Sequence, residues 1–131
     1  ACSHQIVRHR LASYSQMSQR YVKSGSELDV VVPPSILAAP KALDAFEIYM
    51  ETAAEEYYIL TEQFKIKPED ARFVLPNAVA TELIMTANLR EWLHFVNLRS
   101  SPRAQWEIQA IANDIKNILN KELPELFIEK D

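Results

Sequence analysis

Glycine is nearly absent from this sequence: Gly25 is the single glycine among 131 residues. The Rossmann fingerprint and the P-loop each need several residues without a Cβ close to the bound phosphate. One glycine cannot supply either, so the sequence excludes both of these glycine-rich nucleotide-binding loops. Any nucleotide that binds here must be held by side chains.

Cysteine is equally scarce, since Cys2 is the only one. A single cysteine excludes an internal disulfide and a cysteine-based zinc cluster, and a lone thiol near the start of a chain is more often inert than nucleophilic. The histidines are His4, His9 and His94, and they show neither His-x-x-x-His nor HExxH spacing. The sequence therefore predicts no metal site.

Long hydrophobic runs are missing as well. No stretch approaches the roughly 20 apolar residues that a membrane-spanning helix needs, and the first residues lack the apolar core and cleavage site of a signal peptide. We therefore expect no membrane partner and a cytoplasmic location. Hydrophobic residues make up 48% of the chain, which is enough for a core, and we predict one domain over residues 1–131.

Carboxylates are absent from the first 26 residues, although the whole chain has 18 Asp and Glu against 14 Lys and Arg and a formal net charge of −4. Among the basic side chains of the same segment are Arg8, His9, Arg10, Arg20 and Lys23. A local excess of positive charge in an acidic protein favours a site for an anion. The alternative is that these charges lie by chance on solvated helix faces.

Arginine and lysine are also segregated along the chain. The seven arginines lie in two blocks, 8–20 and 72–103, whereas the seven lysines lie outside both blocks. The planar guanidinium grips phosphates and carboxylates through two parallel hydrogen bonds, while lysine is a flexible, strongly hydrated charge. The separation therefore indicates that the arginines belong to an anion-binding surface and the lysines to a solvated surface.

The apolar pattern predicts an α+β chain that is mostly helical in this portion, with one short strand segment. The expected helices cover residues 2–11, 41–64, 68–75, 77–98 and 101–123. The β-branched run in residues 27–32, which two prolines stop, predicts the strand. Residues 11–26 have no period and are rich in Ser, Gln and Tyr, so we expect a polar loop there.

Spacings of three and four residues predict which side chains form the core. In the second helix these are Leu43, Phe46, Met50, Ala53, Tyr57, Leu60 and Phe64, and in the last helix Ala104, Ile108, Ile111, Ile115, Ile118 and Leu119. On the helix before it, Asn88 and Arg99 are expected to share one face, and Arg90 and His94 another. Asn88 and His94 could equally be ordinary hydrogen-bonded core residues.

Two separated motifs resemble one family. Arg8-His9-Arg10, followed after seven residues by Ser18 and then Gln19-Arg20-Tyr21, resembles the RHR-x7-S signature of the flavin-dependent thymidylate synthases, the ThyX family. Residues 88–99 and 104–108 are similar to the C-terminal half of that family. The resemblance implies a ThyX-like fold of which this chain is the C-terminal portion, with the N-terminal sheet strands missing. The start at Ala1 without a capping residue agrees with that expectation.

The resemblance also implies an activity. Members of the family convert dUMP to dTMP, with methylenetetrahydrofolate as carbon donor and NADPH as reductant through FAD, and they work as homotetramers with active sites at subunit interfaces. The expected catalytic residue is Arg99, whose guanidinium would face the uracil, favour ionisation at N3 and raise the electron density at C5. Ser18 is expected to be a ligand, because no His lies one turn away to activate its hydroxyl.

The site residues implied by the resemblance fall into two sets. The residues expected to hold dUMP are Gln5, Arg8, Gln16, Ser18, Gln19, Arg20, Arg72 and Arg99, with Arg72 reaching the nucleotide from a neighbouring chain. The residues expected to hold FAD are Arg8, His9, Arg10, Gln16, Asn88, Leu89, Arg90 and His94.

Two other functions remain open at this point. One is a non-catalytic nucleotide- or flavin-binding or assembly fragment of the enzyme, because the N-terminal portion of the family is not in this chain. The other is nucleic-acid binding, in which Tyr14 and Tyr21 would stack on bases within the basic segment. A pI near 5.4 disfavours nucleic acid as a partner, because domains that bind it usually carry net positive charge.

Overall fold

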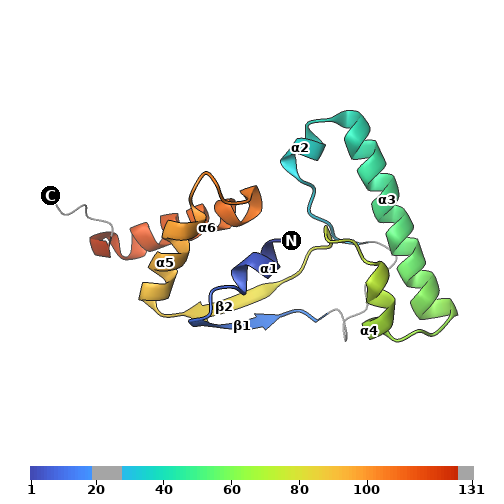
Figure 1. Cartoon of the computed structure of the whole chain (residues 1–131), viewed down its shortest axis with the longest axis horizontal. Helices are drawn as coiled ribbons and strands as arrows, with labels where there is room; N and C mark the ends of the chain where they lie inside the picture. The colour runs from blue at the N-terminus through green and yellow to red at the C-terminus, as the bar shows by residue number, and fades with distance from the viewer. Residues whose placement is uncertain (19–27, 127–131) are drawn as a thin grey trace. The chain divides into compact units, whose positions relative to one another are not determined.

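The computed structural model describes residues 1–18 and 28–126 (Figure 1). The expectations for Gln19 and Arg20, and for the first residue of the predicted strand, lie outside the described residues. The chain divides into two compact units. We call residues 1–15 with 84–131 the terminal unit and residues 16–83 the central unit. Two units of one chain can belong to one family domain, so the single domain over residues 1–131 stays a prediction.

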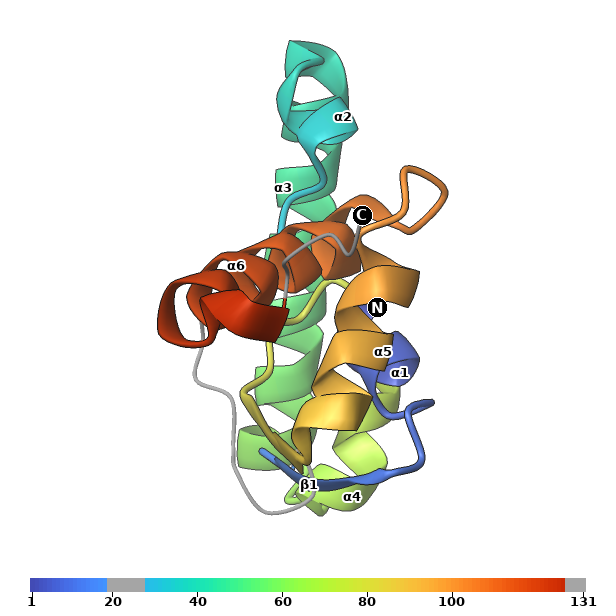
Figure 2. The ribbon, with the colours of Figure 1, turned by 90° about the vertical axis from the view of Figure 1, so that its left-hand side faces the viewer.

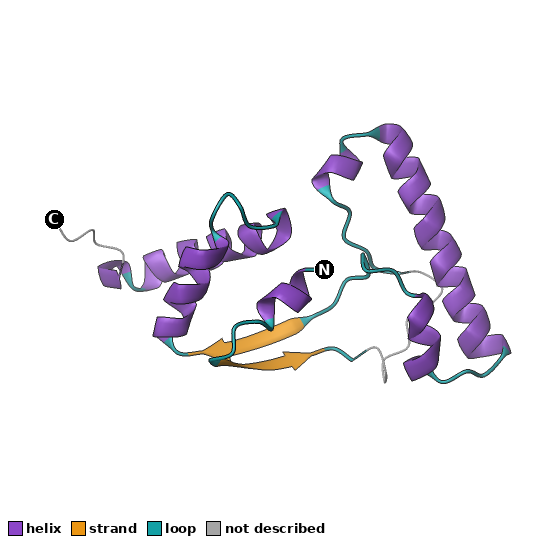
Figure 3. Cartoon of the chain, viewed as in Figure 1, coloured by secondary structure: helices purple, strands orange, loops and turns teal. Residues whose placement is uncertain are grey.

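The terminal unit is built mainly from helices and also contains a short sheet. Its helices are α1 (Cys2–Ile6), α5 (Leu89–Arg99), α6 (Trp106–Glu122) and the 3-10 turn η3 (Pro124–Leu126). Helix α6 packs against both α5 and α1, and Figure 1 shows α5 lying against α6. The strands β1 (Ala12–Gln16) and β2 (Leu83–Ala87) pair in a two-stranded antiparallel sheet (Figure 3). The α+β class is confirmed for the described part of the chain.

Both strands lie where the sequence predicted something else. Strand β1 falls inside the expected loop 11–26, and β2 falls inside the expected helix 77–98. Side chains alternate between half-buried and exposed along β2 and over the first four residues of β1, which is the two-residue period of a sheet with one covered face. Each strand needs the other for its hydrogen bonds, and they lie about 70 residues apart in sequence, so a local pattern could not reveal the pairing.

Helix α5 starts later than expected because a side chain caps it. Asn88 Oδ1 accepts a hydrogen bond from the backbone N–H of Glu91 at 2.9 Å, which satisfies one of the free amides of the first turn. The last helix also begins late, at Trp106 rather than near residue 101. There Gln105 Oε1 accepts from the backbone N–H groups of Glu107 and Ile108. Side-chain capping thus sets the start of both helices.

Helix α1 ends at Ile6 instead of continuing to residue 11 as predicted. The single proton of the Tyr14 hydroxyl is shared between the backbone carbonyls of Ile6, at 2.9 Å, and His9, at 2.6 Å. Carbonyls at the end of a helix need partners from outside it. Tyr14, on β1, supplies them and anchors the segment between α1 and the sheet.

The central unit contains the longest helix. Its elements are α2 (Pro34–Leu37), α3 (Pro40–Tyr58), the π-helical turn η1 (Ile59–Gln63), α4 (Pro68–Ala71) and the 3-10 turn η2 (Arg72–Val74). Together α3 and η1 confirm the helix predicted over residues 41–64. The helix predicted over residues 68–75 is confirmed in part: α4 ends at Ala71 and the 3-10 turn η2 follows it. Pro68, Glu69 and Asp70 lie in the first turn of α4, where proline and carboxylates are favourable.

The predicted strand over residues 27–32 is wrong for its described part. Residues 28–32 form a single isolated antiparallel bridge, from Val30 to Val79. The backbone N–H of Val31 donates to Ala78, and that of Ala80 donates to Asp29. The β-branched run is therefore extended, but within the described residues its ladder stops at one bridge, and Pro33 cannot continue it because proline has no N–H to donate.

The predicted core of α3 is largely confirmed. Met50, Ala53 and Tyr57 are buried, and Tyr57 is fully enclosed at 0% exposure. Phe64 was predicted to join this row but is 67% exposed. The row fails there because η1 has a wider turn than an α-helix, and this rotates the following residues off the 3.6-residue stripe.

The core of the terminal unit centres on α5 and α6. Phe95 and Val96 are each 1% exposed and Ile108 is 0% exposed. Ile118 was also predicted to face inward, yet it is 61% exposed. At 100° per residue it lies about 80° around the helix from Ile108, at the edge of the apolar stripe.

Within the described residues, no helix is both long and apolar enough to cross a membrane.

The contrast between Ile108 and Ile118 gives a stability test. We expect Ile108→Ala to lower the free energy of unfolding by about 2–5 kcal/mol, because it empties space in a close-packed core. The matched control on the same helix, Ile118→Ala, should change it by less than about 0.5 kcal/mol. Urea unfolding followed by circular dichroism measures both values, and equal losses would contradict this assignment of the core.

Candidate functional site

The candidate site of the terminal unit is a chain of three side chains centred on His9. The imidazole Nδ1 of His9 lies 3.3 Å from Glu91 Oε1. On the other side of the ring, Arg99 Nε donates to His9 Nε2 at 3.1 Å. Arg99 also donates from Nη2 to the backbone carbonyl of Gln5 at 3.2 Å. Figure 2 shows the ribbons of α1 and α5 next to each other, and the bond from Arg99 to Gln5 joins these two helices.

The direction of the hydrogen bonds assigns the protonation state of His9. Arginine has only donors and stays charged in proteins, so Nε2 of His9 must accept. The proton of a neutral ring then lies on Nδ1, from which it is donated to the Glu91 carboxylate. The arrangement is a carboxylate, a neutral imidazole and a guanidinium in series.

The surroundings of His9 also favour its neutral form. The residue is only 4% exposed, and burial is the main reason that its pKa is lowered from 6.5. The nearby positive charge of Arg99 lowers it further, whereas the hydrogen bond and charge of Glu91 act in the opposite direction. The ring of Phe95 packs against it with centroids 4.8 Å apart. Burial and the neighbouring cation together outweigh the carboxylate.

Helix α5 explains how two of these groups come to one ring. Glu91, Phe95 and Arg99 are spaced by four residues, so they form one row along the helix. Phe95 is buried, Glu91 is 6% exposed, and Arg99 is half-buried at the last turn. The row faces the segment that follows α1, from which His9 enters. Sequence reasoning missed Glu91, although its spacing from Arg99 was a signal that could have found it.

The remaining predicted residues of the terminal unit come from the segments that carry His9, Glu91 and Arg99, and most of these residues are exposed to solvent. Gln5 is half-buried, and the exposed members are Arg8, Arg10, Asn88, Leu89, Arg90 and His94. Arg90 and His94 share a face of α5, as predicted, being one turn apart. The structure thus brings together Gln5, His9 and Arg99, and it leaves a set of mostly basic side chains accessible.

Three predicted residues belong to the central unit. Gln16 donates from Nε2 to Thr81 Oγ1 at 3.4 Å. Arg72, at the C-terminal end of α4, donates from Nε to the carbonyl of Glu69 at 3.1 Å, and Ser18 is half-buried. The roles given to these residues stay predictions.

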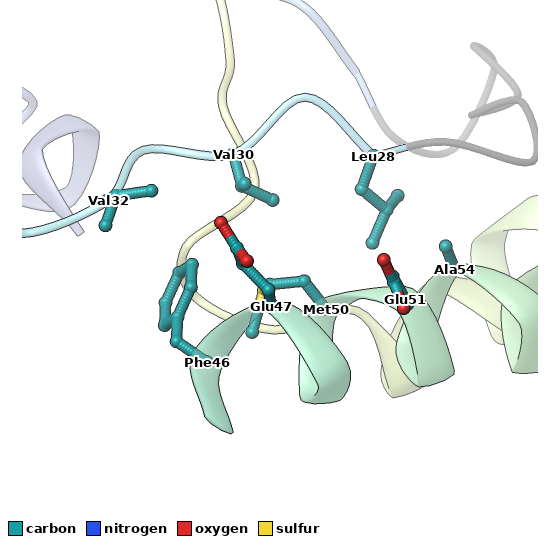
Figure 4. Close-up of a pocket in the computed structure, with 8 residues that line it drawn as sticks. All are labelled: Leu28, Val30, Val32, Phe46, Glu47, Met50, Glu51 and Ala54. Carbon is teal, nitrogen blue, oxygen red and sulfur yellow. The ribbon is translucent and has the colours of Figure 1, made fainter. Parts of the chain in front are cut away.

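The central unit also holds a cavity of about 400 Å³ between α3 and residues 28–32 (Figure 4). Its lining is mainly apolar, with the carboxylates of Glu47 and Glu51 among the side chains that face it. None of the predicted ligands lines this cavity. Two carboxylates and no basic group make it unsuited to an anionic nucleotide.

His9, Glu91 and His94 bring their possible metal-ligating atoms within 4.8 Å of one another. A cation would have to displace Arg99 from His9 Nε2 or the proton from Nδ1, because both ring nitrogens already make hydrogen bonds. A guanidinium in contact with the ring also repels a metal ion. The geometry therefore suits a hydrogen-bonded chain better than a metal site, and the absence of a metal stays a prediction.

Cys2 is near Arg99 of the candidate site, but its thiol is expected to be unreactive. It is buried at 5% exposure, and burial, with a smaller effect of the Glu107 charge, raises the pKa of its thiol to about 11. The thiolate is the nucleophilic form of cysteine. The expectation that this thiol is inert agrees with its surroundings.

Comparison with known proteins adds a family relationship. The family described as Thy1, thymidylate synthase complementing protein, matches residues 1–125. The flavin-dependent thymidylate synthase of Geobacter sulfurreducens is 48% identical over 128 residues, covering 97% of this chain and 55% of that protein. The enzyme of the same name from Nitratidesulfovibrio vulgaris is 46% identical over 134 residues, with 97% and 54% covered.

A third relative carries the same name. The flavin-dependent thymidylate synthase of Saccharolobus solfataricus is 44% identical over 126 residues, covering 95% of this chain and 47% of that protein. The chain therefore spans about half the length of the curated relatives it matches. The family resemblance drawn from the two sequence motifs is confirmed.

The protonation of His9 can be tested directly. We expect ring signals in NMR to give a pKa below 6.5 in the folded chain and a return to about 6.5 in urea, where burial and the Arg99 charge are lost. The unfolded chain then takes up this proton at higher pH than the folded chain. The free energy of unfolding should therefore fall as the pH is lowered from about 6.5 toward the folded pKa. A folded pKa at or above 6.5 would contradict the assigned hydrogen bonds.

The reactivity of Cys2 gives a second test. With a thiol pKa of about 11, we expect alkylation by iodoacetamide at pH 8 to be about 100-fold slower in the folded chain than in urea. Mass spectrometry of the single cysteine measures both rates. Equal rates in the two conditions would show that the thiol is as accessible and as readily ionised as in the unfolded chain, against the structure.

Proposed function

The chain belongs to the Thy1 family, the thymidylate synthase complementing proteins, and on that premise we propose that it acts in the flavin-dependent methylation of dUMP to dTMP. The proposed carbon donor is methylenetetrahydrofolate, and the proposed reductant is NADPH, through FAD. The names of three relatives at 44–48% identity support a flavin-dependent thymidylate synthase. The observation that carries the proposal is the guanidinium of Arg99, oriented at two of its nitrogens within a largely basic, accessible surface.

Arg99 is the proposed catalytic residue. Its Nε and Nη2 are engaged by His9 and Gln5, and within residues 1–18 and 28–126 no partner is seen for Nη1. A guanidinium held at two atoms presents its remaining N–H groups in a defined direction. Facing a uracil, it would stabilise negative charge on the ring that develops when N3 ionises, and this raises the electron density at C5.

The nucleotide phosphate would be held by arginine forks. A phosphate monoester carries nearly two negative charges near neutral pH, and Arg8 is exposed close in sequence to the His9 ring. Arg72, Ser18 and Gln16 of the central unit, with Gln19 and Arg20, complete the proposed dUMP set. Arg72 is proposed to act from a neighbouring chain. No glycine-rich loop is required, in agreement with the lone Gly25.

The residues present also fit a flavin. The first turns of α5 expose Asn88, Leu89, Arg90 and His94, and Arg10 is exposed as well. Their amide and basic groups suit the pyrophosphate and the anionic reduced ring. When bound, FAD supplies the redox and carbon-transfer chemistry. The part of this chain is to bind and orient, which needs no catalytic triad and no metal.

Assembly into a homotetramer is part of the proposal, because Arg72 is assigned to a site on another chain. Exposed apolar side chains on the central unit support a protein partner: Ile48 is 64% exposed and Tyr49 is 58% exposed, next to each other on α3. Large apolar side chains left exposed on a helix are available to a second chain.

A second candidate is favoured by the length of the chain. Because it spans about half of its curated relatives, it could be a fragment that binds nucleotide or flavin, or that assembles, without turnover. This candidate predicts that dUMP and FAD bind while NADPH is not oxidised. The two candidates share the same binding site and differ only in catalysis.

A visible-absorption titration tests the shared site. We expect the spectrum of FAD added to the purified chain to be perturbed by dUMP. Arg99→Ala should raise the dissociation constant for dUMP about 10- to 100-fold, because it removes charge-assisted hydrogen bonds. The matched control is Arg103→Ala, which removes an exposed arginine that has no proposed role.

The outcomes separate the proposals. An unperturbed flavin spectrum, or equal losses in the two arginine variants, would contradict the assigned site. Perturbation without oxidation of NADPH, when methylenetetrahydrofolate is present, would favour the non-catalytic candidate. Turnover to dTMP would support the synthase.

A further inference from the structure

We propose that Glu91 is a positioning residue that holds Arg99 in its working orientation through the ring of His9. The inference rests on the proposed function, since it assigns how the guanidinium is presented to the nucleotide. Glu91 was not among the predicted ligands. It enters because it is the one buried carboxylate among the residues the structure describes.

The burial of Glu91 needs an explanation. Its side chain is 7% exposed and that of His9 is 3% exposed. Removing a carboxylate from water is costly unless hydrogen bonds compensate. The bond to His9 Nδ1 compensates part of that cost. Since apolar residues would fill this place more cheaply, a role for the carboxylate beyond packing is favoured.

Glu91 determines which nitrogen of His9 carries the proton. A carboxylate can only accept, so it selects the tautomer with the proton on Nδ1 and leaves the lone pair of Nε2 toward Arg99. Without Glu91 the ring can take the other tautomer, in which an Nε2–H faces the Nε–H of Arg99. Two donors cannot bond to each other, so the guanidinium would lose one of its two anchors.

The spacing along α5 explains why an intermediary is needed. Glu91 and Arg99 are eight residues apart, which is about 12 Å along the helix axis. The imidazole, which enters from the segment after α1, spans the gap between them. A neutral ring between the charges orients the guanidinium without a direct ion pair. The positive charge of Arg99 therefore stays available to an anionic group.

The first experiment needs no variant. Nitrogen-15 NMR of the histidine rings in the purified chain reports the tautomer of His9, and the Nε–H signal of Arg99 reports its hydrogen exchange. We expect His9 to carry its proton on Nδ1 at neutral pH and the Arg99 Nε–H to exchange slowly. An Nε2-protonated or doubly protonated His9 ring would overturn the inference, whether or not the chain binds a nucleotide.

The second experiment uses Glu91→Gln and Glu91→Ala, with Asp114→Asn as the control. Asp114 is exposed on α6 of the same unit and is not among the charges that act on His9, so this variant removes one negative charge without touching the proposed contacts. We expect both Glu91 variants to populate the other tautomer, to speed Arg99 Nε–H exchange and to raise the dissociation constant for dUMP about tenfold. Glutamine keeps an acceptor oxygen, so its effect should be the smaller one.

Folding and function are controlled separately. Circular dichroism shows which variants fold, and if Glu91→Ala does not, the wild-type chain and Glu91→Gln decide the question. Folded variants with an unchanged tautomer and unchanged exchange at Arg99 overturn the inference. If the wild-type chain does not bind dUMP, the proposed function fails for this chain, while the two NMR signals still decide the role of Glu91.

Discussion

The site depends on one interaction, the insertion of the neutral His9 ring between Glu91 and Arg99. A buried imidazole must satisfy both of its nitrogens, and here it does so with a carboxylate and a guanidinium from the same helix. The bonds of Arg99 to His9 and Gln5 tie the start of the chain to α5. The hydroxyl of Tyr14 then holds the segment between α1 and β1. The ring of His9 thus joins the Arg8-His9-Arg10 segment to Glu91 and Arg99, which lie 82 and 90 residues further along the chain.

The distribution of charge follows from the same arrangement. The chain is acidic as a whole, at −4, yet the side chains around the site are mostly basic and exposed. The carboxylate of the site, Glu91, is buried behind His9 and does not contact the guanidinium directly in any hydrogen bond that the described residues show. An anion approaching Arg99 therefore meets positive charge first, while the compensating negative charge stays inside.

The helices of this fold were more predictable than its strands, because helical signals are local. Proline at the start of α4 and the row of Met50, Ala53 and Tyr57 on α3 could be recognised from neighbouring residues alone. Strand β1 could not, because its Ser, Tyr and Gln residues become a strand only when β2 pairs with them. The same long-range dependence misplaced the strand expected before Pro33, which forms one bridge.

The sequence by itself determined the family, through the Arg8-His9-Arg10 and Ser18 spacing and the similar stretch over residues 88–99, and it excluded glycine-rich nucleotide loops. Through the resemblance to that family it also made Arg99 a candidate. Only the tertiary structure decided how that arginine is held. His9 lies more than 80 residues from Glu91 and Arg99 in sequence, and the tautomer of a ring depends on which groups the fold places beside each nitrogen.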